Sequence, residues 1–312
     1  MLRFAIGKLI QGTAMFIAVS ALTFFLLSSA GGDAFDALRE NPQVSDETIE
    51  HLRAVYGLDR PVVSRYFSWL TSFATGDLGD SINFKISVSS LVFFKLLYTI
   101  LLGSVALLIA WTIAIVLSYL AALKKNRRLD RAIEFLILIS ASIPRIALSL
   151  FVLAFMVWMS TRALGITAGS LVSFVLSAFV LAFPLISIFL AQANSELQSA
   201  MEEEFVQLAR AKGLDERTVI VKHASRAALN PLITLFGLSL GGIISATVIV
   251  ETILGWPGIG SLVVSAVRSR DIPLVMGIVV VSSLAVWLGN AIAEMLQMTN
   301  DRRLRDRDLD LN

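Results

Sequence analysis

Five runs of this sequence contain no Asp, Glu, Lys or Arg, and each is at least 22 residues long. At a helical rise of about 1.5 Å per residue, such a run spans about 33 Å, enough to cross a hydrocarbon core of about 30 Å. A sixth run, Phe135–Thr161, is interrupted only by Arg145. The sequence therefore predicts an all-α membrane protein. The five uncharged runs are Leu9–Gly32, Leu96–Leu123, Ala163–Ser195, Ala227–Val250 and Ile272–Ala293.

Composition agrees with this class and excludes several chemistries. The chain is 56% apolar and 16% charged, and its mean hydropathy is +0.77. The absence of cysteine removes disulfides, zinc–thiolate sites, iron–sulfur clusters and thiol nucleophiles, and two histidines are too few for an imidazole metal cluster. A net charge of +2 gives no argument for nucleic-acid binding.

The runs divide the chain into one transmembrane domain over residues 1–312. The first run is longer than the apolar core of a secretory signal, so we expect it to be a retained span. An outer loop over 32–95, a cytoplasmic segment over 196–228 and a C-terminal tail over 297–312 lie between and after the spans. The spans are predicted near 9–31, 97–123, 133–160, 170–194, 229–250 and 273–295.

The distribution of positive charge predicts the orientation. Six spans place both termini on one side, and the segments on that side carry 16 Lys and Arg residues, whereas the short opposite loops carry three. The 16 lie within 3–8, 124–131, 210–226 and 302–307. By the positive-inside rule, both termini are expected in the cytoplasm.

The outer loop is predicted to contain two helices. Ile49, Leu52 and Tyr56 share one helical face, and Gly57 is placed to end that helix. Pro61 suits the first turn of a second, amphipathic helix. We expect this second helix to lie on the outer membrane surface or to pack on other spans.

The cytoplasmic segment encodes a helix, a glycine elbow and a second helix. Glu202–Glu204 favour a helix N-terminus, Gly213 supplies a left-handed cap, and Asp215 can cap a helix that starts at Glu216. This arrangement is suited to being held by a soluble partner, although a solvated hairpin that binds nothing would have the same pattern. Four residues of the first helix are expected to share a face, namely Phe205, Leu208, Ala209 and Lys212.

At this segment the sequence resembles a known family. The run Gln207–Gly213 resembles the EAA motif of ATP-binding cassette (ABC) importer permeases, although Gln207 and Leu208 stand where the general motif has Glu and Ala. Further landmarks, in order, are similar to the B-type permease subunits of dipeptide, oligopeptide and nickel importers: Tyr56–Pro61, Gly76–Gly79, Ser142–Pro144, Arg210–Leu214 and Val250–Gly260.

The resemblance implies a type I ABC importer permease fold with six transmembrane helices, a helical extracytoplasmic loop and a cytoplasmic coupling helix. It also implies that the coupling helix docks on an ATPase subunit. The implied ATPase-coupling residues are Glu204, Phe205, Gln207, Leu208, Ala209, Arg210, Ala211, Lys212 and Gly213.

The energy source is expected on another chain, because no G-x-x-x-x-G-K-[ST] phosphate-binding loop occurs in this sequence. The resemblance implies a non-enzymatic pore subunit in a bacterial inner membrane, with ATP and Mg bound by partner subunits. The implied partners are a C-type permease, two ABC ATPases, an extracytoplasmic solute-binding protein, membrane lipid and a peptide-like solute. Dipeptides, oligopeptides, modified peptides, nickel chelates, glutathione and oligosaccharides all remain open as substrates.

Arg145 is the candidate for the substrate pathway. It lies 14 residues beyond Arg131, so a continuous helix would carry it about 15–20 Å into the bilayer. A guanidinium there costs at least about 2.5–3.5 kcal/mol on insertion scales, so it should face a cavity or a partner. Ser142 and Ser149 are spaced to share its face, and the stripe could attract a substrate carboxylate. The alternative is an arginine bonded to neighbouring helices or to the companion subunit.

Span five carries two further candidate features. Gly237, Gly241 and Ser245 recur every four residues and are expected to pack closely on another helix, with pathway lining as the alternative. A rigid outer gate is expected where the span ends, with Trp256 as an interfacial anchor. The candidate gate residues are Glu251, Trp256, Pro257 and Gly258.

Two rival classes remain beside the importer permease. A secondary transporter or channel would usually place acidic residues inside the membrane for ion coupling, whereas Arg145 is the only mid-span charge in this sequence. An intramembrane enzyme would need a Ser–Lys, paired-Asp or His–Glu constellation, and no Lys, Asp or His lies mid-span.

Overall fold

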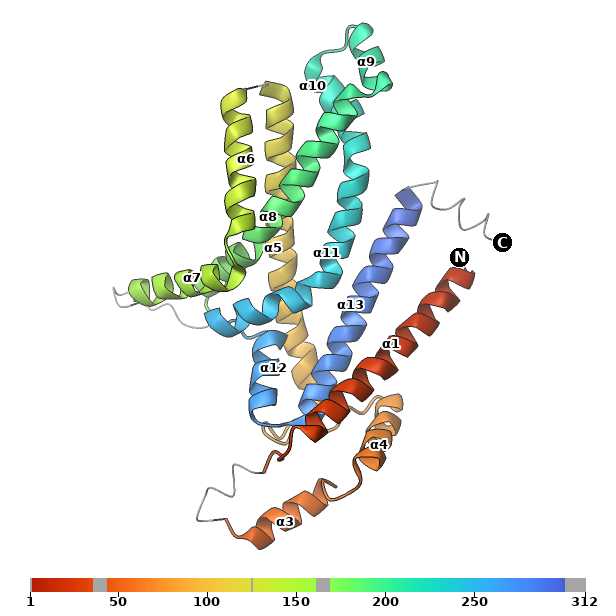
Figure 1. The fold of residues 1–312 in the computed structure, drawn as a ribbon, viewed down its shortest axis with the longest axis vertical. Helices are drawn as coiled ribbons and strands as arrows, with labels where there is room; N and C mark the ends of the chain where they lie inside the picture. The colour runs from red at the N-terminus through yellow and green to blue at the C-terminus, as the bar shows by residue number, and fades with distance from the viewer. Residues whose placement is uncertain (1, 36–43, 125, 161–168, 301–312) are drawn as a thin grey trace. The chain divides into compact units, whose positions relative to one another are not determined.

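The computed structural model describes residues 2–35, 44–124, 126–160 and 169–300. Over these residues the fold is built from helices, and one isolated bridge between Asp80 and Ser87 is the β pairing found there (Figure 1). The predicted all-α class is confirmed. The predicted tail beyond residue 300 and the stretch 161–168 lie outside the described residues.

The helices follow the predicted runs, and several extend beyond them. The long α5 has 37 residues, about 55 Å at the helical rise, so it extends beyond a hydrocarbon core of about 30 Å. In chain order the elements are α1 (Leu2–Ser29), α3 (Asp46–Val55), α4 (Val62–Ala74), α5 (Val88–Lys124), α6 (Arg127–Ser142), α7 (Arg145–Met159), α8 (Leu171–Glu202), α9 (Glu204–Ala211), α10 (Glu216–Thr218), the π-helix η2 (Val219–Ala224), α11 (Ser225–Leu254), α12 (Ile259–Arg268) and α13 (Ile272–Asn300).

Among the described residues, five helices are long and apolar enough to cross a membrane. A sixth span is obtained only if α6 and α7 are taken together. The count of six spans therefore stays a prediction. The five spans are Ile6–Ser29, Val88–Lys124, Leu171–Glu202, Pro231–Leu254 and Ile272–Ile292.

The predicted span over 133–160 is not one straight helix, because α6 and α7 meet at a bend of 92°. Ile143 is extended (φ −86°, ψ 115°), and Pro144 precedes the first residue of α7. A proline ring disfavours helical backbone at the residue before it and supplies no N–H to the preceding turn. The Pro144 ring thus ends α6, and the chain leaves in a new direction.

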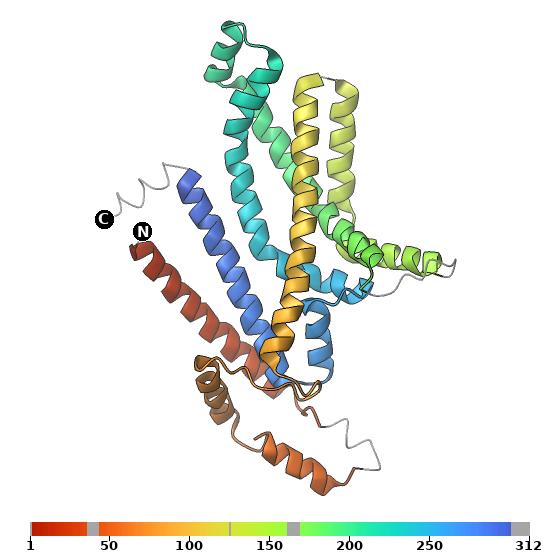
Figure 2. The same cartoon turned by 180° about the vertical axis from the view of Figure 1, so that it is seen from behind.

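The chain divides into two compact units, and α5 and α13 contribute residues to both. The first comprises Met1–Tyr98 and Pro257–Trp287, and the second comprises Thr99–Trp256 and Leu288–Asn312. In the second unit, α8 supplies the buried centre, with Phe189 and Leu190 fully buried, and α6, α7 and α11 pack around it. Both ribbon views show α5 and α6 side by side in this unit (Figures 1 and 2).

In the first unit, α4 packs along α1 through aromatic side chains. The ring centroids of Phe16 and Phe73 are 4.6 Å apart, and Tyr66 Oη lies 3.1 Å from Ser20 Oγ. Of the two predicted places for the second outer-loop helix, packing on another span is therefore the one observed. Gly57 has the expected left-handed backbone (φ +63°) after α3, and Pro61 directly precedes α4.

Asp271 ties the outer loop of the first unit to the start of α13. Its carboxylate is fully buried and accepts hydrogen bonds from Ser81 Oγ at 2.6 Å and from the Asn83 backbone N–H at 2.9 Å. It also accepts from the Leu274 N–H at 3.2 Å, as an N-cap does. The loop is fixed at this point, although its sequence separation from Asp271 is about 190 residues.

Candidate functional site

The segment after α8 forms the predicted helix, glycine elbow and helix. Glu203 is extended (φ −64°, ψ 145°) and separates α8 from α9, and Gly213 takes the left-handed conformation (φ +76°) after α9. Asp215 Oδ2 accepts the Thr218 backbone N–H at 3.1 Å and so caps α10, as predicted. This hydrogen bonding to Thr218 lowers the pKa of the Asp215 carboxyl. Gly213 thus sets the elbow after α9, and Asp215 sets the start of α10.

A small apolar core holds α9 in place. Val206 and Ala209 face inward and pack with Leu197 of α8 and with Val219 and Ile220 of η2. Val206, Val219 and Ile220 are fully buried. The prediction that Ala209 shares the exposed face is therefore wrong, because it lies three residues after Val206 on the buried side of the helix.

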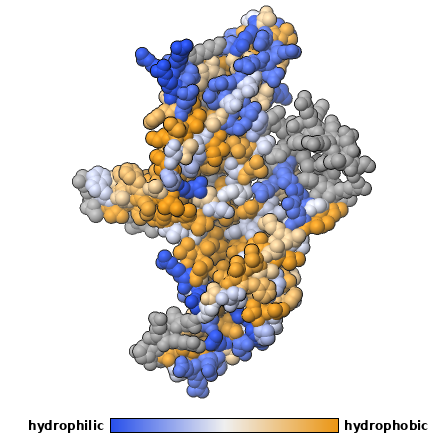
Figure 3. Space-filling model, viewed as in Figure 1, coloured by the Kyte–Doolittle hydropathy of each residue, from blue (hydrophilic) through white to orange (hydrophobic). Residues whose placement is uncertain are grey.

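The opposite face of α9 presents apolar side chains to its surroundings. Phe205 is 43% exposed, Leu208 is 57% exposed, and Leu214 beyond the elbow is 41% exposed. Lys212 is exposed beside them. Figure 3 shows this end of the second unit as mostly hydrophilic, with hydrophobic side chains between the polar ones. An apolar face on a rigid polar projection is typical of a contact site for another protein.

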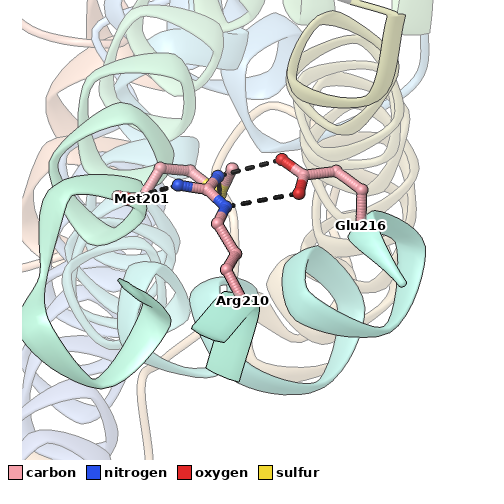
Figure 4. A network of polar contacts seen from close by, with 3 residues as sticks. All are labelled: Met201, Arg210 and Glu216. Carbon is pink, nitrogen blue, oxygen red and sulfur yellow. Dashed lines mark hydrogen bonds and ion pairs between the residues drawn. The ribbon is translucent and has the colours of Figure 1, made fainter. Parts of the chain in front are cut away.

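Arg210 braces the elbow from the inside (Figure 4). Its Nη2 lies 2.9 Å from Glu216 Oε1 and its Nε lies 3.3 Å from Glu216 Oε2, a two-point pairing of guanidinium and carboxylate. Nη1 also donates to the Met201 carbonyl at 3.5 Å. The guanidinium thus joins the end of α8, α9 and α10 in one network. Sequence reasoning missed Glu216 and Met201, although an Arg and a Glu six residues apart across a glycine elbow were the available signal.

The remaining predicted coupling residues line the outside of the elbow. Gln207 donates from Nε2 to the Glu202 carbonyl at 3.3 Å, which closes the junction of α8 and α9. The structure therefore brings most of the predicted set to one exposed surface and turns Ala209 and Arg210 away from it. The exposed members are Glu204, Phe205, Gln207, Leu208, Ala211, Lys212 and Gly213.

Arg145 stands at the start of α7, beside α11. Its Nη1 donates to the Ala246 carbonyl at 3.3 Å, and its Nε is buried without a partner among the described residues. The predicted common face with Ser142 is wrong, since the break at Pro144 puts Ser142 on a different helix. Ser149 is fully buried and donates back to the Arg145 carbonyl at 2.8 Å, so its hydroxyl does not line a path in this structure.

The outer end of α11 is tightly packed. Glu251 is fully buried and accepts a hydrogen bond from Thr99 Oγ1 at 2.6 Å, a partner that the sequence did not indicate. Gly255 ends the helix in the left-handed conformation (φ +70°). Trp256 is buried and packs against Phe174, with the ring centroids 4.9 Å apart and the ring planes tilted by 47°. The prediction of Trp256 as an interfacial anchor is therefore wrong, because an anchor needs an indole exposed to the headgroups.

The small residues of α11 include one close helix contact. A side chain at Gly241 would collide with Asn290 of α13, and a Cβ added to Gly289 would lie 3.3 Å from the Gly241 backbone nitrogen, closer than most real Cβ contacts. Gly237 is buried as well, whereas Ser245 is exposed. Gly241 therefore permits the approach of α13, and Ser245 does not contribute to it.

Apolar helices long enough to cross a membrane, with a helical projection between two of them, are typical of a membrane transport subunit. Residues 114–306 match the model of the binding-protein-dependent transport system inner membrane component, and residues 1–85 match the model of the N-terminal part of such components. The chain belongs to this family, and its relatives identify it as an ABC permease of the dipeptide, oligopeptide and nickel type. It is a multi-pass protein of the bacterial inner membrane.

Relatives with related names align over nearly the whole chain. A peptide permease protein of Brucella suis is 31% identical over 317 residues, which cover 98% of this chain and 99% of the relative. The oligopeptide transport system permease protein AppB of Bacillus subtilis is 31% identical over 97% of this chain and 99% of its own length. The nickel import system permease protein NikB of Staphylococcus aureus is 27% identical, over 96% and 90% respectively.

Proposed function

We propose that this chain is the B-type permease of an ATP-driven importer for peptides or related small solutes. It would form half of the pore with a C-type permease, two ABC ATPases would bind on the cytoplasmic side, and a solute-binding protein would deliver the substrate outside. ATP and Mg would bind on the ATPase chains. The peptide and nickel names of the relatives support this range of substrates.

The observation that carries the proposal is the exposed apolar face of α9. Phe205 and Leu208 project from α9, and the exposed Leu214 follows beyond the elbow; the core under α9 and the Arg210 network hold this segment in place. We infer that an ATPase cleft covers this face, because apolar side chains grouped on a rigid projection gain free energy when a partner removes them from water.

Two observations support an orientation of the chain in the membrane: the distribution of positive charge and the arrangement of the second unit. The α5–α6 turn lies at the same end of this unit as α9 in both ribbon views (Figures 1 and 2). Residues 124–131 and 210–226, both rich in Lys and Arg, would then face the same side. We propose that this side and both termini are cytoplasmic. Residues 1–312 would form one permease domain, because α5 and α13 run through both units.

The test places a charge on the docking face. Leu208→Glu should abolish co-purification of the ATPase subunits and ATP-dependent uptake, since a carboxylate would be buried without a partner at the contact. The matched control is Val55→Glu in α3, an equally exposed apolar residue of the outer loop (66% exposed). If Leu208→Glu keeps both the ATPase subunits and uptake, docking through α9 is excluded. If uptake continues with ATPase subunits that cannot hydrolyse ATP, the alternative of a secondary transporter or channel is favoured.

We also propose that Arg145 faces the substrate path and that residues 251–258 form an outer gate. The buried, unpartnered Nε of Arg145 supports a role in holding a carbonyl or carboxylate. Arg145→Gln should slow uptake and change substrate preference, while Arg145→Lys should keep part of both. If Arg145→Gln takes up substrate at the wild-type rate and with the wild-type selectivity, the pathway role is contradicted and Arg145 is a helix-packing residue.

A further inference from the structure

The first unit contains a cavity of about 220 Å³ whose walls come from the outer-loop landmarks. The Tyr56–Pro61 and Gly76–Gly79 runs, the polar face of α4 and the start of α13 surround it. The coupling and pathway residues lie elsewhere, in the second unit. The lining residues with charged or hydrogen-bonding side chains include Arg60, Arg65, Ser68, Trp69 and Asp77.

The cavity is rich in hydrogen-bond donors that lack an acceptor. In the described part of the chain, no carboxylate lies within ion-pair distance of Arg60 or Arg65, whereas Arg53 is paired with Asp33 at 2.7 Å. Trp69 Nε1 is buried and has no hydrogen-bond partner among these residues. Two guanidinium groups without an ion-pair partner in the described part of the chain therefore line one space, beside a buried indole N–H that has no acceptor.

Arg65 is held in position. Its guanidinium carbon lies 5.7 Å from the centre of the Phe24 ring, within the range of a cation–π contact. Burial lowers the pKa of Arg65, and the more distant Asp33 carboxylate raises it in part. Asp77 is the one acidic residue in the cavity wall. Its carboxylate accepts a hydrogen bond from the Gly79 backbone N–H at 2.8 Å and so stabilises the turn over Gly76–Gly79.

Apolar side chains form another part of the cavity wall. Phe24, Leu78 and Ile82 line the cavity and are buried within the first unit. A cavity of about 150 Å³ can hold a benzene-sized group, so this space fits one apolar side chain and an anionic group.

We propose that this cavity binds the C-terminal residue of a peptide, with its carboxylate on Arg60 and Arg65 and its side chain against Phe24, Leu78 and Ile82. This inference rests on the proposed function, since it names the end of the solute that the importer would recognise. A guanidinium matches a carboxylate by two parallel hydrogen bonds, and both become stronger in a partly buried site.

The experiment uses the purified importer complex in phosphatidylcholine nanodiscs without the solute-binding protein. Binding of the tripeptide Gly-Gly-Leu and of its C-terminal amide is measured by calorimetry and by the fluorescence of Trp69, with Trp69→Phe identifying that signal. The free acid should bind at least about tenfold more tightly than the amide. Arg60→Gln and Arg65→Gln should each weaken the acid by about tenfold or more, the range for hydrogen bonds to charged groups.

Matched variants separate this role from folding. Arg268→Gln removes an exposed arginine of the same unit outside the cavity and should leave binding unchanged. Arg65→Lys keeps the charge over Phe24 and should bind with intermediate affinity, so it tests the site even if Arg65→Gln fails to fold.

Three results would overturn the proposal. One is equal binding of acid and amide, and another is displacement of the peptide by phosphatidylglycerol, which would assign the site to anionic lipid. The third is wild-type binding of the free acid by both Arg60→Gln and Arg65→Gln. Failure of the proposed function would be seen separately, as loss of ATPase co-purification with the wild-type chain.

Discussion

Removal of Arg210 should loosen α9 without unfolding the spans. The guanidinium makes two hydrogen bonds to Glu216, at 2.9 and 3.3 Å, and both side chains are 35% exposed. Solvent screening limits such a pair, so we assign it about 1 kcal/mol, the upper end for exposed ion pairs, because the geometry has two points of contact. The long bond to the Met201 carbonyl adds little.

A loss of about 1 kcal/mol raises the population of the opened elbow about fivefold. In Arg210→Ala, the amide protons of α9 should therefore exchange about fivefold faster, while those of α8 keep their wild-type protection. Transport per ATP hydrolysed should fall in parallel, because a loosened helix transmits less of the ATPase movement. Hydrogen exchange by mass spectrometry and paired transport and ATPase assays measure the two effects.

The control is Arg217→Ala, which removes an exposed arginine next to Glu216. The exchange of the two partners, Arg210→Glu with Glu216→Arg, should recover part of the protection. Wild-type exchange in Arg210→Ala, or equal losses in Arg217→Ala, would refute the assignment of Arg210 as a brace.

Three further changes test the packing of the second unit. Thr99→Val removes the hydroxyl that donates to the buried Glu251 carboxylate and should lower the free energy of unfolding by about 1.5–3 kcal/mol. The control, Thr252→Val, changes an exposed threonine and should leave the stability unchanged. Equal effects of the two variants would contradict a structural role of the Thr99 hydroxyl. Gly241→Leu should lower the free energy of unfolding by about 1–3 kcal/mol and reduce the yield of folded chain, because the new side chain would collide with α13. Gly242→Leu should be tolerated, because Gly242 has open space beside it. A normal yield of Gly241→Leu would contradict the close approach of α11 and α13. Asp215→Ala should speed exchange of the α10 amides at pH 7. The difference from wild type should begin to shrink as the pH falls below about 4 and should vanish only below the lowered pKa of the folded state, where the carboxyl is protonated.

Local signals in the sequence predicted the elements well where one residue decides the backbone. Gly57, Gly213 and Asp215 act as the caps that their chemistry favours, and the uncharged runs became long helices. The break at Pro144 was misjudged, because hydropathy alone continues through it and only the backbone restriction of proline opposes a straight span.

The sequence predicted which segment forms the candidate site, but it did not predict which side of α9 is buried and which is exposed. A periodicity argument grouped Ala209 with Phe205 and Leu208, because all three are apolar, but the position of η2 decides which side of α9 is buried. The partners of Arg210 and Glu251 lie on other elements, and long-range pairs such as Thr99 with Glu251 are set by helix packing. No local pattern encodes them.

The connections of α9 explain why a brace is useful for coupling. One extended residue, Glu203, joins it to α8, and α10 with η2 leads from its elbow directly into α11. These two long helices pack on each other and form much of the core of the second unit. A displacement of α9 by a bound ATPase would therefore reach both helices, provided that the elbow does not deform first. The buried Val206 and the Arg210 network oppose that deformation, so the same contacts that fix the docking face would also convert its movement into a rigid-body shift of the spans.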